Sequence, residues 1–311
     1  MNDLLSVSFL SALVSGGILA GMPVLFASLG ETISERAGVL NIGLEGMMLA
    51  GGYAGFVAAL YSEQHWLGLA ASVGAGALIG VIVAWCCVGL RMDQIVVGIA
   101  VLILAEGVTS VLQRAQFGTT YPRLEQVAIV KIPLLSSIPV LGSSLFTQPL
   151  VVYIGFAMIG VLHWLLKSTY IGLNLRAAGE KPEAVDAAGI SVVAIRAVAV
   201  LVTGGLAGLG GGYMAIVGAG IFVPFMTKGA GFIAIVVAML ARGRAVWVLI
   251  GSLLFGMSVS LTTSLQLIGV EVAQDVVNMI PFVAVMIALV AFARGAYLPA
   301  ALAIPYHREA R

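Results

Sequence analysis

The sequence predicts an all-α fold, a polytopic bundle of about eight to ten membrane-spanning helices. Hydrophobic residues make up 61% of the 311 residues and charged residues only 9%. A soluble domain carries about a quarter charged residues. The fifteen Lys and Arg residues and fourteen Asp and Glu residues of this chain are too few to cover a surface that faces water. Because long apolar runs recur along the whole chain, we expect a bilayer to be its solvent.

Each apolar run is judged by its length. A bilayer core about 30 Å thick requires about 20 residues of helix. Nine runs reach or approach that length: residues 4–29, 39–60, 66–90, 95–112, 150–166, 192–217, 231–240, 245–268 and 276–293. They are too long and too continuously apolar for barrel strands. We therefore expect one transmembrane domain over residues 1–311, with the first run retained as a span.

Glycine predicts where helices break and where they pack closely. Residues 30–46 and 218–231 are candidates for broken or re-entrant segments, which would change the number of spans. Small residues four apart let helices approach closely in lipid, so we expect internal packing at several glycines. These are Gly17 with Gly21, Gly51 with Gly55, Gly76 with Gly80, and Gly204 with Gly208 and Gly212.

The distribution of Lys and Arg predicts the orientation, because cytoplasmic loops retain basic residues. If the loop 167–191 is cytoplasmic, alternation of the spans places eleven of the fifteen basic residues inside. The C-terminus is then cytoplasmic and the N-terminus external. The long loop 114–148 is external and unusually apolar, which fits either a docking surface for an external partner or a lid over the spans.

The loop 167–191 contains the most informative soluble segment. Pro182 suits the first position of a helix, Glu183 suits the positive end of its dipole, and Gly189 suits the position just after its end. A helix of about two turns is marginal in water and needs a surface to hold it. These residues alone leave two interpretations open: a plain solvated helix, or a rigid element that passes the motion of a soluble motor to the spans.

Residues 172–190 read G-L-N-L-R-A-A-G-E-K-P-E-A-V-D-A-A-G-I. This segment resembles the coupling loop of ABC-importer permeases of the ribose, nucleoside and branched-chain amino acid class, with Val185 where a second alanine is usual. The resemblance implies that this cytoplasmic coupling helix and its flanks contact an ATPase. The residues concerned are Arg176, Gly179, Glu180, Pro182, Glu183, Ala184, Asp186, Ala187 and Gly189.

Three further segments resemble the nucleoside branch of that class: S-E-R-A-G-V-L-N-I-G-L-E-G at residues 34–46, I-P-L-L-S-S-I-P-V-L-G at 132–142 and A-A-L-A-I-P-Y at 300–306. The resemblance implies a second related permease, a pair of cytoplasmic ATPase subunits that hold ATP and Mg, and an external substrate-binding protein. This chain has no G-x-x-x-x-G-K-[ST] element of its own, so we expect no cofactor on it. Its net charge of +1 gives no basic face for nucleic acid.

Polar residues inside apolar runs are candidates for the translocation path, because they are costly in hydrocarbon. Asn41 and Glu45 are four residues apart and would share one helical face, where they line a path or hold a broken segment together. Glu106 is the most deeply placed carboxylate, and it either faces a cavity or makes an interhelical hydrogen bond. It stands where the resembled class has an apolar residue, which leaves the substrate open between nucleosides and simple sugars. Asn278 is the fourth candidate.

A second class of function uses the same residues. An ion-gradient-driven secondary transporter would need no partner and would bind its ions at Glu45 and Glu106. No catalytic Ser, His and Asp arrangement and no metal-ligand spacing is present in the sequence, so we expect neither an enzyme nor a metal site.

Overall fold

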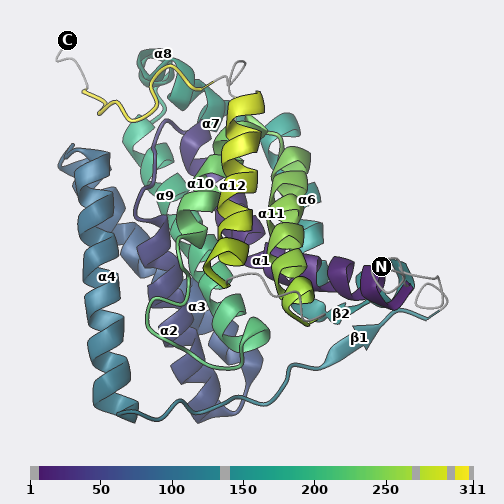
Figure 1. Cartoon of the computed structure of the whole chain (residues 1–311). Coiled ribbons are helices and arrows are strands. Elements are labelled where there is room, and N and C mark those ends of the chain that lie inside the picture. Colours follow the sequence, from purple (N-terminus) through teal and green to yellow (C-terminus); the bar gives the residue numbers. More distant parts are fainter. Residues whose placement is uncertain (1–6, 134–140, 268–273, 293–297, 308–311) are drawn as a thin grey trace.

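The structure is a computed structural model that describes residues 7–133, 141–267, 274–292 and 298–307 (Figure 1). Its helices are α1 (Val7–Arg36), α2 (Leu44–Ser62), α3 (His65–Val83), α4 (Gln94–Phe117), α5 (Leu141–Leu145), α6 (Leu150–Ser168), α7 (Tyr170–Glu180), α8 (Pro182–Ala187), α9 (Val192–Gly212), α10 (Ala230–Ala241), α11 (Ala245–Leu267) and α12 (Gln274–Phe292). Single π-helical turns continue α3 at Ala84–Gly89 and α9 at Tyr213–Gly218.

Each of the nine predicted apolar runs contains a helix, so the all-α polytopic fold is confirmed. Seven of the described helices are long and apolar enough to cross a membrane. Helix α12 is not one of these seven, but its 19 residues are close to the length that a membrane span requires. In contrast, α10 has 12 residues, about 18 Å of helix, which reaches only part of the way across a bilayer.

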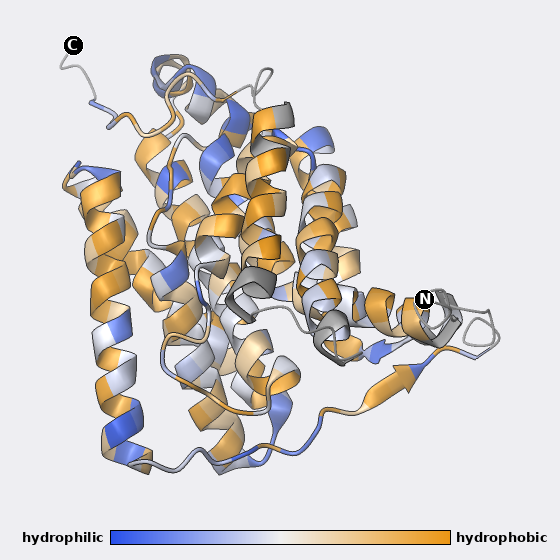
Figure 2. Cartoon of the chain, viewed as in Figure 1, coloured by the Kyte–Doolittle hydropathy of each residue, from blue (hydrophilic) through white to orange (hydrophobic). Residues whose placement is uncertain are grey.

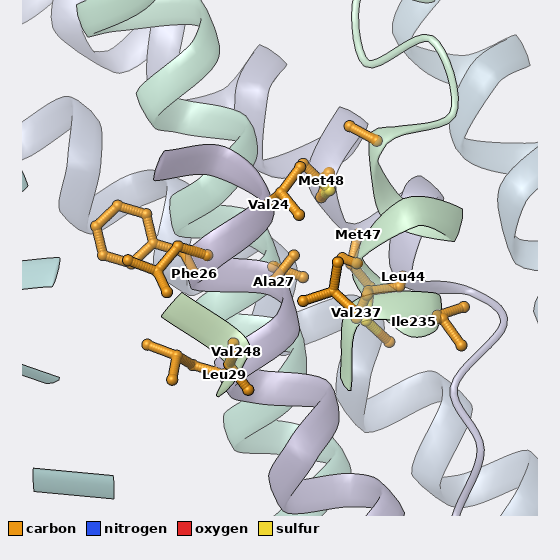
Figure 3. Close-up of a cluster of buried hydrophobic side chains, with 14 of the residues drawn as sticks. Val24, Phe26, Ala27, Leu29, Leu44, Met47, Met48, Ile235, Val237 and Val248 are labelled. Carbon is orange, nitrogen blue, oxygen red and sulfur yellow. The ribbon is translucent and has the colours of Figure 1, made fainter. Parts of the chain in front are cut away.

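Helix α9 lies at the centre of the bundle and packs on α1, α2 and α3, while α11 packs on α1 and α4 lies at one edge against α2 (Figure 1). Side chains of α1, α2, α10 and α11 meet in the core, where Phe26, Met47 and Val237 are buried (Figure 3). Segments far apart in the sequence therefore share one core.

Glycine allows the central helices to touch backbone to backbone. A Cβ atom on Gly51 would overlap the main chain of Gly208, and one on Gly76 would overlap the carbonyl oxygen of Gly204. On the other side of the bundle, a Cβ atom on Gly21 would lie 2.6 Å from the carbonyl oxygen of Ser252. The predicted internal packing of these glycines is confirmed.

The outer face of the bundle is apolar. Large side chains such as Trp85, Ile103, Trp164 and Leu254 are more than half exposed. Figure 2 shows apolar residues along the helices and hydrophilic residues gathered at the α7 and α8 end and at the opposite end of α4. This distribution is that of a protein whose middle is surrounded by lipid.

Two groups of connections mark opposite ends of the bundle (Figure 1). Helices α7 and α8 lie at one end, together with the segment 298–307. The connection from α4 to β1 (Ile129–Lys131) crosses the other end, and β1 pairs antiparallel with β2 (Thr147–Pro149), with Val130 opposite Gln148. The two strands were not predicted, because three residues are too few to give a pattern of alternation.

Part of the long loop 114–148 packs on the bundle. The Leu124 N–H donates to the carbonyl oxygen of Gly220 at 2.8 Å, and the Leu124 side chain packs on a cluster that includes Phe56 and Phe222. Residues 134–140, which contain most of the motif at 132–142, lie outside the described residues.

Candidate coupling element and transport site

The loop 167–191 contains two helices. Helix α8 begins at Pro182 and ends at Ala187, as predicted. Gly189 follows with a φ of +80°, a conformation that glycine adopts without strain, and its N–H donates to the carbonyl oxygen of Asp186 at 2.9 Å. Helix α7 was not predicted, although Thr169 marks its start by accepting a hydrogen bond from the Gly172 N–H at 3.1 Å.

Helix α8 has one face fixed to the bundle and one face free. Pro182 and Val185 are buried, and Val185 packs in a small cluster with Ala178 and Val192. The opposite face is exposed and consists of small and acidic side chains, namely Glu183, Ala184 and Ala187. A surface of this kind allows a partner to approach the helix backbone closely.

The structure brings the nine predicted coupling residues together at one end of the bundle. Gly179 is buried, while Arg176, Glu180 and Asp186 are half-buried. The Nε atom of Arg176 donates to the carbonyl oxygen of Gly172 at 3.2 Å, one turn earlier in α7. Their role in coupling stays a prediction.

The second feature is a junction between two broken helices. Helices α2 and α10 both begin here, after the non-helical segments 37–43 and 219–229. Glu45, in the first turn of α2, accepts hydrogen bonds from the N–H groups of Gly229 at 2.8 Å and Gly231 at 2.5 Å. Its carboxylate therefore satisfies main-chain donors at the start of α10, where the helix dipole is positive. The predicted breaks are confirmed, and Glu45 holds them together.

Asn41 does not share a helical face with Glu45, so that expectation is wrong. Helix α2 begins only at Leu44, and Asn41 lies in the non-helical segment before it. The Asn41 N–H donates to Oε1 of Glu31 at 3.1 Å, and its Nδ2 atom donates to the sulfur of Met47 at 3.3 Å. Asn41 is buried and ties this segment to α1.

Two buried carboxylates in α1 were missed. Glu31 is 0% exposed and Glu35 is 2% exposed. In the described part of the chain, Oε2 of each has no hydrogen-bond partner. Their spacing of four residues, directly after an apolar run, places them on one face of a helix and is the signal that would have identified them.

Glu106 lies near the middle of α4, where it is half-buried. No hydrogen bond or ion pair to its carboxylate is present among the described residues. Gly46 packs against Val101 and Ala105, which places the junction at Glu45 and the middle of α4 at the same level.

Ser110 and Gln113 lie on the same face of α4 as Glu106. Ser110 follows Glu106 by four residues, and Gln113 follows Ser110 by three. Gln113 is buried, and neither its amide oxygen nor its amide nitrogen has a partner in the part of the chain that is described. We call these three residues the α4 polar strip. Asn278 lies in α12, but its side chain is outside the described residues.

A polytopic bundle with two broken helices whose N-termini meet near its middle has the architecture of a membrane transport protein. Comparison with known proteins also indicates a transport protein. The family described as branched-chain amino acid transport system, permease component, matches residues 13–290. The chain belongs to this family.

Relatives extend over most of the chain. It is 33% identical to the guanosine ABC transporter permease protein NupQ of Bacillus subtilis over 98% of this chain and 99% of that protein. It is 33% identical to the nucleoside ABC transporter permease protein NupC of Lactococcus lactis over 96% of this chain and 98% of that protein. It is 32% identical to the putative glucose ABC transporter permease protein TsgC13 of Haloferax volcanii over 81% of this chain and 77% of that protein. No solved structure matches.

Proposed function

We propose that this chain is the permease subunit of an ATP-binding-cassette importer that moves nucleosides, or simple sugars, across a bacterial plasma membrane by alternating access. It works with a second related permease, cytoplasmic ATPase subunits that hold ATP and Mg, and an external substrate-binding protein. Membership of the permease family and the names of the relatives support this function.

The observation that carries the proposal is the division of α8 into a fixed face and a free face. Val185 anchors the helix to the bundle, while Ala184 and Ala187 are exposed. A six-residue helix is too short to be stable alone. Because its inner face is held by α7 and α9, a push on its outer face reaches the spans.

This role places the α8 end of the bundle in the cytoplasm. The segment 298–307 lies at the same end, so the C-terminus is cytoplasmic as well. The connection 118–128 lies at the opposite end, on the side of the external binding protein (Figure 1). The distribution of basic residues supports the same orientation.

Nucleosides are the first choice of substrate. The guanosine and nucleoside permeases align with nearly the whole chain, whereas the sugar permease aligns with 81% of it. The α4 polar strip supplies a carboxylate next to the level where the broken helices meet, and a hydroxyl and an amide further along the helix toward its end at Phe117. These groups suit a hydrogen-bonding solute. Asn41, Glu45, Glu106 and Asn278 remain the path candidates. Asn41 and Glu45 both bond to their own chain, but Oδ1 of Asn41 has no partner among the described residues.

Reconstitution in proteoliposomes tests the proposal. Uptake of a radiolabelled nucleoside is measured with this chain and its second permease, with and without the ATPase subunits and the loaded binding protein. We expect ATP-dependent uptake from the full set and none from the permeases alone. Uptake by this chain alone under a proton or sodium gradient would instead establish a secondary transporter, and it would be lost in Glu45→Gln or Glu106→Gln.

A further inference from the structure

We infer that Arg196 and the C-terminal segment 298–307 form a clamp that locks α7, α8 and the end of α1 into one moving body. The inference rests on the proposed coupling role of α8 and assigns positioning residues to it. Arg196 belongs to α9, the helix that follows the coupling loop.

Arg196 is 2% exposed, and its guanidinium bonds to main-chain carbonyl oxygens of three segments that are far apart in the sequence. It donates to Ala37 at 3.1 Å and to Ile304 at 2.8 Å. It also donates to Ala178 and Ala301, both at 3.4 Å. A planar guanidinium with several donors fixes the relative positions of these main chains in a way that a single ammonium group does not.

The same three segments bond directly to one another. The Ala301 N–H donates to the carbonyl oxygen of Gly179 at 2.8 Å, and the Ala303 N–H donates to that of Gly38 at 3.2 Å. A Cβ atom on Gly38 would lie 2.8 Å from Nη2 of Arg196 and 3.2 Å from the Gly179 Cα atom. Gly38 has a φ of +88°, so both its conformation and its surroundings require glycine. The segment 298–307 therefore joins α7 to the end of α1.

The clamp connects α8 with the transport site. Residues 37–43 are non-helical, and a loop of this kind absorbs motion unless it is held. Through the clamp, a displacement of α8 and α7 reaches Gly38 and the last turn of α1. From there, Nη2 of Arg36 donates to the carbonyl oxygen of Arg242 in the turn between α10 and α11. Residues 37–43, which lead into α2, and the C-terminal end of α10 are thus linked to α8.

The test uses the complete complex in proteoliposomes and measures substrate uptake and ATP hydrolysis for each assembled complex. The first variant is Arg196→Gln, and the second is a chain that ends before Leu298. The matched control is Arg91→Gln. It removes an exposed side-chain contact at 3.3 Å to His307, the last residue of the segment 298–307, and leaves the bonds of Arg196, Ala301 and Ala303 in place.

Substitutions along a coupling route change the coupling by about twofold to thirtyfold. We expect the ratio of ATP hydrolysed to substrate moved to rise about tenfold in both clamp variants and to stay unchanged in Arg91→Gln. A purely structural role would lower uptake and hydrolysis in proportion, so a constant ratio overturns the clamp. Failure of both clamp variants to assemble overturns it as well. Absence of ATP-driven uptake in the wild-type complex would instead refute the proposed function.

Discussion

Glu45 is buried inside the bundle, and both of its carboxylate oxygens accept hydrogen bonds from main-chain N–H groups at the start of α10. It is 4% exposed, so water does not replace these bonds when they are lost. Glu106 is different, because its carboxylate has no partner among the described residues and is only half-buried. The two residues should therefore differ in how a substitution changes the stability of the bundle.

Glu45→Gln replaces one acceptor oxygen with an NH₂ group that faces a main-chain N–H. We expect a loss of about 1–3 kcal/mol of stability, the cost of leaving a buried donor unpaired. Thermal unfolding in detergent, followed by size-exclusion chromatography, measures the effect. The matched variant Glu106→Gln should unfold at the wild-type temperature, and equal losses in both variants would contradict the difference in roles.

Glu106→Leu tests the α4 polar strip in transport. Leucine removes a carboxylate from the middle of a span, so we expect unchanged or higher thermal stability. If the strip contacts the solute, uptake falls by about tenfold, the effect of losing roughly one good hydrogen bond. Wild-type uptake by Glu106→Leu would remove Glu106 from the path.

At the scale of elements, the ends of α8 follow from local chemistry. Pro182 and Gly189 act through their own backbone angles, so the sequence alone predicts this helix correctly. The start of α2 has no such signal, because the apolar run 39–60 continues through residues where the backbone is not helical. That is why the prediction that Asn41 and Glu45 share one helical face is wrong. The N–H groups that donate to Glu45 are more than 100 residues away from it in the sequence. The carbonyl groups that accept from Arg196 belong to three separate segments, two of them more than 100 residues away. Only the tertiary structure reveals these contacts.

Helix α8 should lose its function when its free face or its end is changed. Ala184→Asp adds a charge to the exposed face, and Gly189→Pro requires a φ near −65° where the chain has +80°. We expect both variants to insert into the membrane at wild-type levels and to lose substrate uptake. Ala184→Ser adds a single hydroxyl group and no charge, and it should retain uptake. ATP-driven uptake and ATPase stimulation at wild-type levels in the first two variants would refute the coupling role.

The glycine contacts between central helices should be intolerant of even one methyl group. Gly76→Ala places a Cβ atom against the main chain of Gly204, and we expect a loss of about 1–3 kcal/mol from overpacking. Gly107→Ala is the control, because nothing lies within 4 Å of its Cβ position and alanine favours a helix by about 0.5–1 kcal/mol. Thermal unfolding in detergent compares the two, and equal stability would show that the helices separate easily.

At the scale of the whole molecule, the proposed function requires one particular orientation. Helix α8 contacts an ATPase only if its end of the bundle faces the cytoplasm, and the connection after α4 meets an external binding protein only if it faces outward. Basic residues predict this orientation through the cost of moving them across the membrane during insertion, which is independent of the contacts in the folded chain. The distribution of basic residues and the proposed contacts of α8 are therefore independent grounds for the same orientation.

Single cysteines provide the measurement, in a chain whose Cys86 and Cys87 are replaced by serine. Thr119 and Ala188 are both exposed and lie near opposite ends of the bundle. We expect a membrane-impermeant maleimide to label Thr119→Cys in intact cells and Ala188→Cys only after the membrane is opened. Because the fold fixes the two positions on opposite ends, labelling in the reverse order would place α8 outside, where no nucleotide-driven motor operates, and the coupling role of α8 and the clamp would fall together.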